Sequence, residues 1–198
     1  GRIVRLGGVD IATGLTSTVP AVGPVGSEVL GPLSSLVDAI QSGQPSLSVE
    51  QAEAIVAKSL GLPEGTAVTQ IDPIESAASG DPDAIDLINA AAQVQDTLVQ
   101  ITSLIDAAAG GSVSAPESVL NALAKSMLAD KPIDLTEPDQ IQAIISASVE
   151  REGLELTQEL SDAAAEVVAD GNQAKDDAAQ SGNPLEVAKL ISKIQSVT

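Results

Sequence analysis

The 198-residue sequence contains no cysteine, no histidine and no aromatic residue. Without cysteine, the chain forms no disulfide, offers no thiol nucleophile and builds no zinc–thiolate site. Without histidine, it lacks the usual general base and the usual ligand of transition metals. Without aromatic rings, it lacks the flat stacking surfaces that sugar, pigment and flavin sites use. The residue types left for chemistry are Ser, Thr, Lys, Asp and Glu.

Basic residues are scarce. Nine Lys and Arg stand against 28 Asp and Glu, which gives a formal net charge of −19. A surface this negative repels phosphate and anionic lipid headgroups, so we expect no nucleic-acid partner. No apolar run is long enough to span a bilayer, and the sequence therefore predicts no membrane insertion. Because the chain begins at Gly1 and shows no signal peptide, we expect it to be a piece of a longer polypeptide.

The sequence does contain many small aliphatic residues and many signals for helix starts. Hydrophobic residues make up 43% of the chain, with a single methionine at Met127. Pairs such as Asp72-Pro73 and Asn183-Pro184 place a cap before proline at the first helical position, and Ser48 with Gln51 forms a capping-box pattern. These features predict an all-α fold, an irregular bundle of about seven to nine helices. The predicted helices cover 29–42, 48–60, 73–79, 83–109, 116–129, 138–151, 155–170, 173–181 and 184–197.

The predicted helix over 83–109 is the most informative element. Apolar residues from Ala84 to Ile105 recur every three or four positions, and a narrow polar stripe that includes Asp96 occupies the opposite side. A helix that is apolar around most of its circumference needs neighbours on several sides. We therefore expect this helix to lie at the centre of the bundle.

Residues 1–28 differ from the rest of the chain. Arg2–Leu6 alternates as a short strand does, and a series of glycines and prolines follows. We interpret 1–28 as an extended N-terminal connector or as the last strand of an upstream domain, and 29–198 as the helical bundle. The bundle divides further, on one interpretation, into a core at 29–150 and peripheral helices at 151–198. The strand has no predicted partner within the chain, so it lies on the helices, pairs with another copy or stays disordered.

Little in the sequence suggests catalysis. Lys58-Ser59 and Lys125-Ser126 are serine–lysine neighbours, but adjacent residues of a helix point in different directions, and we interpret the lysines as solvated charges. Carboxylates stand at helix starts or on polar stripes, where they cap and solvate helices. We predict that the chain has no catalytic residue and no cofactor, and a carboxylate-based hydrolase is the weakest hypothesis.

Calcium binding is a more serious possibility than catalysis. It needs several oxygen ligands from a flexible loop. The best cluster surrounds the interruption expected at Gly171, and its candidate ligands are Asp170, Asn172, Asp176 and Asp177. The cluster lacks the spacing of a helix-loop-helix calcium loop. A second, poorer candidate is the segment 81–83.

The first half of the chain resembles a family. Arg2–Gly14 is similar to a join in very large surface proteins of marine bacteria and cyanobacteria, where a β-domain ends in a strand and an alanine-rich helical domain follows. Val29–Val37 resembles the first helix of that domain, and Leu60–Pro63, Asp72–Ile74 and Ala90–Gln95 resemble its later landmarks. The resemblance implies an exported, adhesin-like, multidomain and non-enzymatic context with calcium-binding β-modules as neighbours. It implies no functional residues.

Two hypotheses for function follow from the residues and the resemblance. The first is a non-catalytic structural or interaction module of a large secreted or cell-surface bacterial protein, with a spacer or adhesive role. Its partners are then the neighbouring domains of the same polypeptide, another protein or another copy. The alternative is a calcium-responsive binding module. Calcium titration combined with thermal melting separates the two, because a ligand that binds only the native state raises the midpoint.

Overall fold

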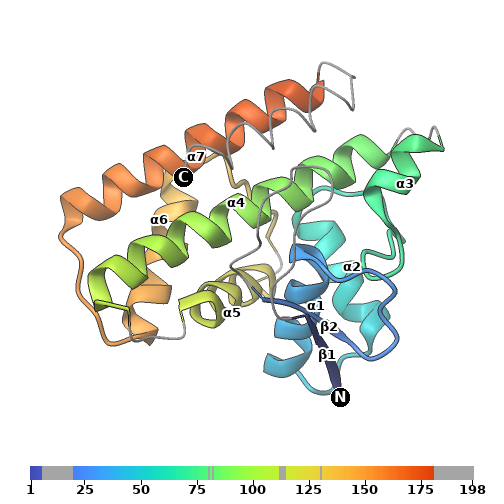
Figure 1. Cartoon of the computed structure of the whole chain (residues 1–198), viewed down its shortest axis with the longest axis horizontal. Helices are drawn as coiled ribbons and strands as arrows, with labels where there is room; N and C mark the ends of the chain where they lie inside the picture. Colours follow the sequence, from blue (N-terminus) through green and yellow to red (C-terminus); the bar gives the residue numbers. More distant parts are fainter. Residues whose placement is uncertain (6–19, 80, 82, 112–114, 130, 181–198) are drawn as a thin grey trace.

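The computed structural model describes residues 1–5, 20–79, 81, 83–111, 115–129 and 131–180, and these form a helical bundle with a small β-hairpin (Figure 1). The prediction of an all-α fold with a short N-terminal strand is confirmed. The elements are β1 (Arg2–Arg5), β2 (Ala21–Pro24), α1 (Pro32–Gly43), α2 (Val49–Ser59), α3 (Pro73–Ala78), α4 (Ala84–Ala109), α5 (Ala115–Met127), α6 (Pro138–Arg151) and α7 (Gln158–Gln180).

Several helices begin where the local sequence predicts. In α2, the Gln51 amide donates to the Ser48 hydroxyl at 3.2 Å, and the Ser48 amide donates to the Gln51 side chain at 2.9 Å. This reciprocal pair is the predicted capping box. Helices α3 and α6 start at Pro73 and Pro138, where the missing proline N–H leaves no helical hydrogen bond unmade.

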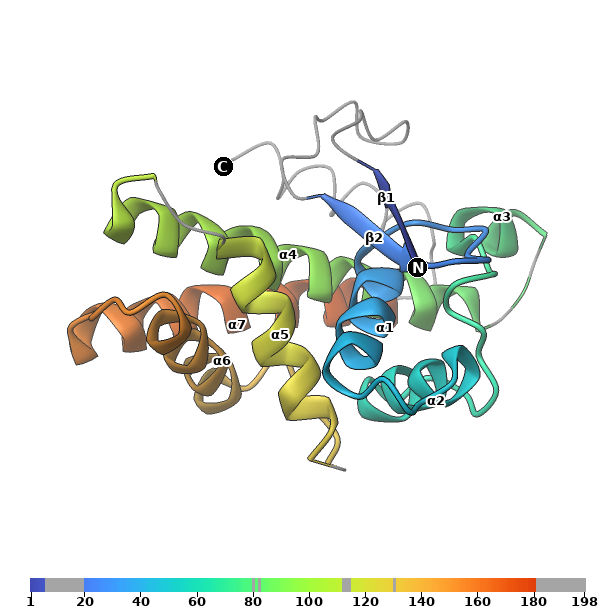
Figure 2. The same cartoon turned by 90° about the horizontal axis from the view of Figure 1, so that it is seen from below.

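Helix α4 lies at the centre of the bundle, as predicted. It contacts α1, α3, α5, α6 and α7, and these neighbours surround it in Figures 1 and 2. Val94, Leu98, Ile101 and Ile105 are each at most 1% exposed. The wide apolar face of the helix therefore packs against neighbours on several sides, which is what its sequence pattern requires.

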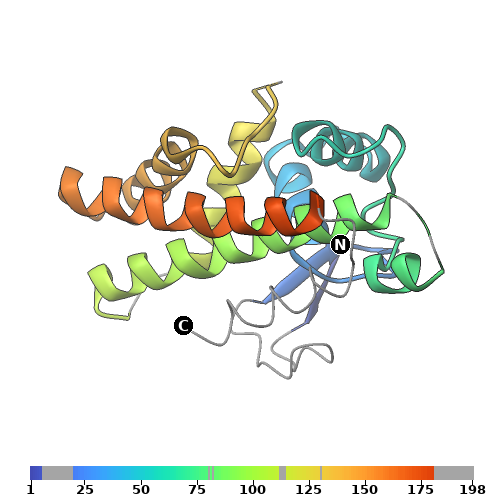
Figure 3. The same cartoon turned by 90° about the horizontal axis from the view of Figure 1, so that it is seen from above.

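Helix α7 corrects the predicted break near residue 171. The sequence suggested two helices, over 155–170 and 173–181, separated at Gly171, and an exposed hairpin beside the bundle. The structure has one continuous helix of 23 residues that runs antiparallel to α4 and also packs on α6 (Figure 3). Val168 and Ala169, close to the expected break, are buried. The glycine has a role in packing, described below.

The main core is aliphatic throughout. Its largest fully buried side chains come from four helices, α1, α4, α5 and α6, and from the segment before α6. They are Leu36, Val37, Ile40, Leu98, Ile101, Ile105, Leu123, Met127, Leu135, Ile141, Ile144 and Ile145. Because none is aromatic, the core gains its stability from many moderate burials rather than a few large ones.

The N-terminal strand has a partner within the chain, so the prediction that it finds none is wrong. β1 pairs antiparallel with β2, with Arg2 opposite Pro24 and Val4 opposite Val22. β2 lies on α1 (Figure 2), where the Ser35 hydroxyl accepts from the Val22 amide at 2.9 Å. A Cβ atom on Gly23 would stand 2.7 Å from a methyl group of Leu30 and 2.8 Å from the Ser27 hydroxyl, so a larger residue there would force these side chains to shift.

Two sequence-based predictions fall on residues that the structure does not describe. These are the helix over 184–197 and most of the N-terminal join that carries the family resemblance. Among the described helices, none combines the length and the apolar character needed to cross a membrane.

Candidate functional site

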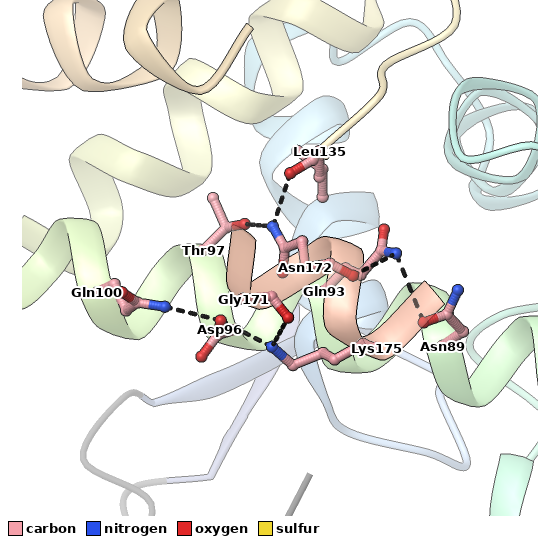
Figure 4. A network of polar contacts seen from close by, with 9 residues as sticks. All are labelled: Asn89, Gln93, Asp96, Thr97, Gln100, Leu135, Gly171, Asn172 and Lys175. Carbon is pink, nitrogen blue, oxygen red and sulfur yellow. Dashed lines mark hydrogen bonds and ion pairs between the residues drawn. The ribbon is translucent and has the colours of Figure 1, made fainter. Parts of the chain in front are cut away.

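A buried ion pair joins α7 to α4 (Figure 4). The ammonium group of Lys175 lies 2.8 Å from a carboxylate oxygen of Asp96, and the two side chains are 3% and 8% exposed. The same oxygen accepts from the Gln100 amide at 2.7 Å, and Lys175 also donates to the backbone carbonyl of Gly171 at 3.1 Å. Each charge thus has polar partners that compensate for its removal from water.

Asn172 extends the polar network toward α6. Its side-chain amide donates to the Thr97 hydroxyl at 3.0 Å and to the Leu135 carbonyl at 2.9 Å, and the residue is fully buried. Its Oδ1 atom has no hydrogen-bond partner in the structure. Asn172 therefore connects α4, α7 and the segment before α6, at the cost of one unmet acceptor.

The polar stripe of α4 faces α7. Asn89 donates to the carboxylate of Asp176 at 3.0 Å, and Gln93 reaches the Asn172 carbonyl at 3.5 Å. Figure 4 shows Asp96 of this stripe beside Gly171 and Lys175 of α7, with Gln93 near Asn172. Residues that sequence patterns would assign to solvent are instead one half of a helix–helix interface.

The four calcium candidates lie on α7, and the loop that their prediction assumed does not exist. Asp170 and Asp177 are exposed, and Asp177 accepts from Gln173 at 2.8 Å. Asn172 points into the core and Asp176 toward α4. In the part of the chain that the structure describes, no three or more Asp, Glu, His or Cys residues gather in a group suited to a metal ion.

In the second calcium candidate, at 81–83, the carboxylate of Asp81 bonds neighbouring groups of the chain. Asp81 accepts from the Ser76 hydroxyl at 2.6 Å and from the Asp83 amide at 3.0 Å. The hydrogen bond from Ser76 is the main reason that the pKa of Asp81 is lowered. This carboxylate therefore has a structural role at the start of α4.

Both serines of the serine–lysine neighbours form hydrogen bonds within the helical framework. Ser59 is buried, and its carbonyl accepts from the Ile133 amide, while Lys58 is exposed. The Ser126 hydroxyl donates to the Ala122 carbonyl at 3.0 Å.

A second buried carboxylate holds the loop that follows α2. Glu53 is 7% exposed and accepts from both the amide and the hydroxyl of Thr69, at 2.8 and 2.7 Å. The Thr69 carbonyl in turn accepts from the amides of Glu28 and Val29. Glu53 thereby ties the loop after α2 to the segment that leads from the hairpin into α1.

A cavity with a charged lining lies between the hairpin, α1 and α5. It has a volume of about 310 Å³ and includes Arg2 and Asp38, whose charged groups are 3.6 Å apart. Val4, Val22 and Leu120 supply apolar walls. Burial raises the pKa of Asp38, and the nearby Arg2 guanidinium opposes this shift only in part.

These buried polar side chains hold helices and loops in place, and the sequence indicated only some of these side chains. Lys175 was missed, although it is the only basic residue between Arg151 and Lys189 and lies in an acidic segment. A lone cation in such a segment is a usable signal for an internal ion pair. Its partner, Asp96, sat on a recognised polar stripe, but only the tertiary fold shows that the two meet.

The fold and its internal bonds define a helical bundle with an N-terminal β-hairpin. Its two longest helices, α4 and α7, meet at a polar seam formed by Asn89, Gln93, Asp96, Asn172 and Lys175. No protein-family model, no curated protein and no solved structure significantly matches this chain.

Proposed function

We propose that the chain is a non-catalytic structural or interaction module of a large secreted or cell-surface bacterial protein, with a spacer or adhesive role. The observation that carries this proposal is the use of the buried charges. The charged residues buried among those described are Asp38, Glu53, Asp96 and Lys175, and each bonds another group of this fold. Charges committed in this way hold elements together and are not poised for a substrate.

The hairpin supports a role next to other domains. All four residues of β1 are exposed, and Ile3 and Val4 are 39% and 45% exposed. Val25, which follows β2, is 66% exposed. Exposed apolar residues on a sheet edge favour contact with another protein surface. The fitting partner is a neighbouring domain of the same polypeptide, packed against this end of the bundle.

A mechanical measurement tests the spacer role. The chain is held by its two ends in optical tweezers and stretched. A spacer should resist force and then unfold in a cooperative step, releasing roughly 3.3–3.6 Å for each residue set free. Gradual extension at low force, with no cooperative step, would contradict the proposal.

Two further measurements address location and calcium. Protease added to intact cells of the source bacterium should cleave this module, and cleavage only after lysis would overturn the surface assignment.

Melting the chain with calcium and with magnesium should give equal midpoints. A midpoint that calcium alone raises would favour the calcium-responsive alternative, because only ligand binding to the native state produces it.

A further inference from the structure

The described residues leave an apolar row on the first half of helix α7 open to solvent. Leu160, Ala164 and Val167 are four and three residues apart, so they share one face of the helix. Leu160 is 46% exposed and Val167 is 61% exposed. Among the described residues of the helical bundle, these are the only large hydrophobic side chains with such exposure, because the others lie in or beside the hairpin.

The row borders a groove whose lining is apolar. The groove lies where the second half of α4 passes the first half of α7, and α6 also contributes to it (Figure 3). Its volume is about 290 Å³, and Ile101, Leu104 and Ile145 line it together with the row. Gln100 is the polar side chain of the lining, and its amide already donates to Asp96 at 2.7 Å. A small ligand needs convergent polar groups that orient it, whereas this lining offers apolar contact of the kind that a packed helix makes.

A row of acidic residues runs beside the apolar row. Glu159, Glu166 and Asp170 are seven and four residues apart, and each immediately precedes a residue of the apolar face. All three are exposed. Over 152–174 the sequence holds six acidic residues and no basic one. A partner on this face therefore needs an apolar side and basic residues along its edge.

We propose that a basic amphipathic helix of another protein docks in this groove. Leu160 and Val167 are about 10.5 Å apart along α7, or two helical turns, and a partner helix repeats its own apolar anchors at that spacing. The apolar side chains of the partner enter the groove between the row and Leu104. Its Lys or Arg side chains then lie beside Glu159 and Glu166, where they form charge-assisted hydrogen bonds.

Charge selects this partner over a second copy and over a membrane. A second copy packed through the same face would bring a second acidic row to the interface, in a chain whose net charge is −19. Anionic lipid headgroups meet the same repulsion. A basic helix is instead attracted by the net charge, and its docking covers both the exposed row and the groove.

Fluorescence anisotropy with a labelled synthetic peptide of Leu, Ala and Lys tests the docking. The peptide is amphipathic and about 18 residues long, because shorter peptides form marginal helices in water. It should bind the full chain with a Kd at least about tenfold below that of a matched peptide that has Glu in place of Lys. Val167→Ser should raise the Kd about tenfold, which is the loss expected for one valine side chain buried by the partner. Val25→Ser, at a site that is 66% exposed beside the hairpin, is the matched control and should leave the Kd unchanged.

Removal of charge tests the acidic row separately. Glu159→Gln/Glu166→Gln should raise the Kd about threefold at low salt, and added salt should reduce this difference. Glu64→Gln/Glu75→Gln makes the same change in net charge at exposed positions in the loop after α2 and in α3, outside the groove, and should leave the Kd unchanged. Circular dichroism verifies that each variant is folded.

Each result decides the proposal. Tighter binding of the Lys peptide, weakened by Val167→Ser and by Glu159→Gln/Glu166→Gln but not by their controls, supports docking in the groove. Absence of binding, or equal weakening in the variants and their controls, overturns it. A dimer in sedimentation that Val167→Ser dissociates also overturns it and would make a second copy the occupant. The proposal rests on the interaction role proposed above, but its failure would leave the spacer role, which stretching tests, unaffected.

Discussion

Two helix interfaces in this bundle are built in different ways. Between α1 and α5, the large side chains that are fully buried are apolar, with Leu36, Ile40 and Leu123 all inaccessible to solvent. Between α4 and α7, the buried groups include the ion pair of Asp96 and Lys175. The first interface depends on shape and area, and the second depends on specific bonds between specific atoms.

The difference bears on how each interface tolerates change. Apolar burial is non-directional, so an aliphatic interface loses stability gradually as side chains are trimmed. A buried polar pair is all-or-none, because removing one member leaves the other charge without compensation. We infer that the α4–α7 seam fixes the register of α7, whereas the aliphatic core supplies most of the stabilising area.

The largest effect is expected for Lys175→Met. Methionine retains much of the length of the side chain but leaves the Asp96 carboxylate buried without its cation. We expect the free energy of unfolding to fall by about 3–5 kcal/mol. Urea denaturation followed by circular dichroism measures it.

The double variant Asp96→Leu/Lys175→Met is the control, because it removes both charges and leaves apolar groups in their place. Most of the lost stability should return, since buried pairs replaced by apolar residues are often neutral. If the double variant is less stable than Lys175→Met alone, the interpretation of the seam as a compensated pair is wrong.

The next effect is expected in the aliphatic interface. Leu123→Ala leaves a cavity in a fully buried site and should lower the free energy of unfolding by about 3 kcal/mol. Val25→Ala, at a site that is 66% exposed, is the control and should cost less than about 0.5 kcal/mol. Similar losses in the two variants would mean that Leu123 is not packed as described.

The aliphatic framework was largely predictable, because its signals are local. The reciprocal bonds of Ser48 and Gln51 involve residues three apart, so the capping box can be recognised without tertiary information. The central place of α4 also follows from its own pattern, since a helix with so wide an apolar face must have several neighbours. Such features depend on spacing along one segment.

The polar seam and the hairpin were not predictable in the same way. β2 contains Gly23 and Pro24, which are typical of a connector, and only the folded chain shows that this segment pairs with β1 and packs on α1. Lys175 and Asp96 are 79 residues apart, so no local pattern links them. The predicted break at Gly171 failed for the same reason, because the glycine serves an approach from α4.

A smaller effect is expected for Gly171→Ala. In an exposed helix this change stabilises by roughly 0.5–1 kcal/mol, because alanine is the better helix former. Here the new Cβ would stand 3.1 Å from an Asp96 carboxylate oxygen, so this oxygen of the ion pair would have to shift by a few tenths of an ångström. We expect that displacement to cancel the gain and cost about 1 kcal/mol in denaturant unfolding. A stabilised variant would show that the polar contacts between α4 and α7 can shift at little cost. The α4–α7 interface would then differ less from the aliphatic α1–α5 interface.

The smallest effect concerns Asp38, at the margin of the aliphatic interface. Burial raises its pKa above the ordinary value of 3.8, so the folded state favours the protonated form. Its contribution to stability is therefore complete below pH 3.8 and is lost as the pH rises through the raised pKa. Relative to the wild type, Asp38→Asn should gain roughly 0.5 kcal/mol or less over that rise, because solvent and Arg2 screen the charge.

Asp81 provides a control of opposite sign. The hydrogen bond from Ser76 lowers the pKa of Asp81, so this carboxylate contributes stability above its ordinary pKa of 3.8 and loses it as the pH falls. Asp81→Asn should therefore lose stability relative to the wild type as the pH rises, whereas Asp38→Asn gains. Denaturant unfolding across the acidic range measures both differences. If the stability of the two variants changes in the same direction with pH, then burial does not set the pKa of Asp38. The ion pair of Asp38 with Arg2 would then be compensated in the way that the Asp96–Lys175 pair is.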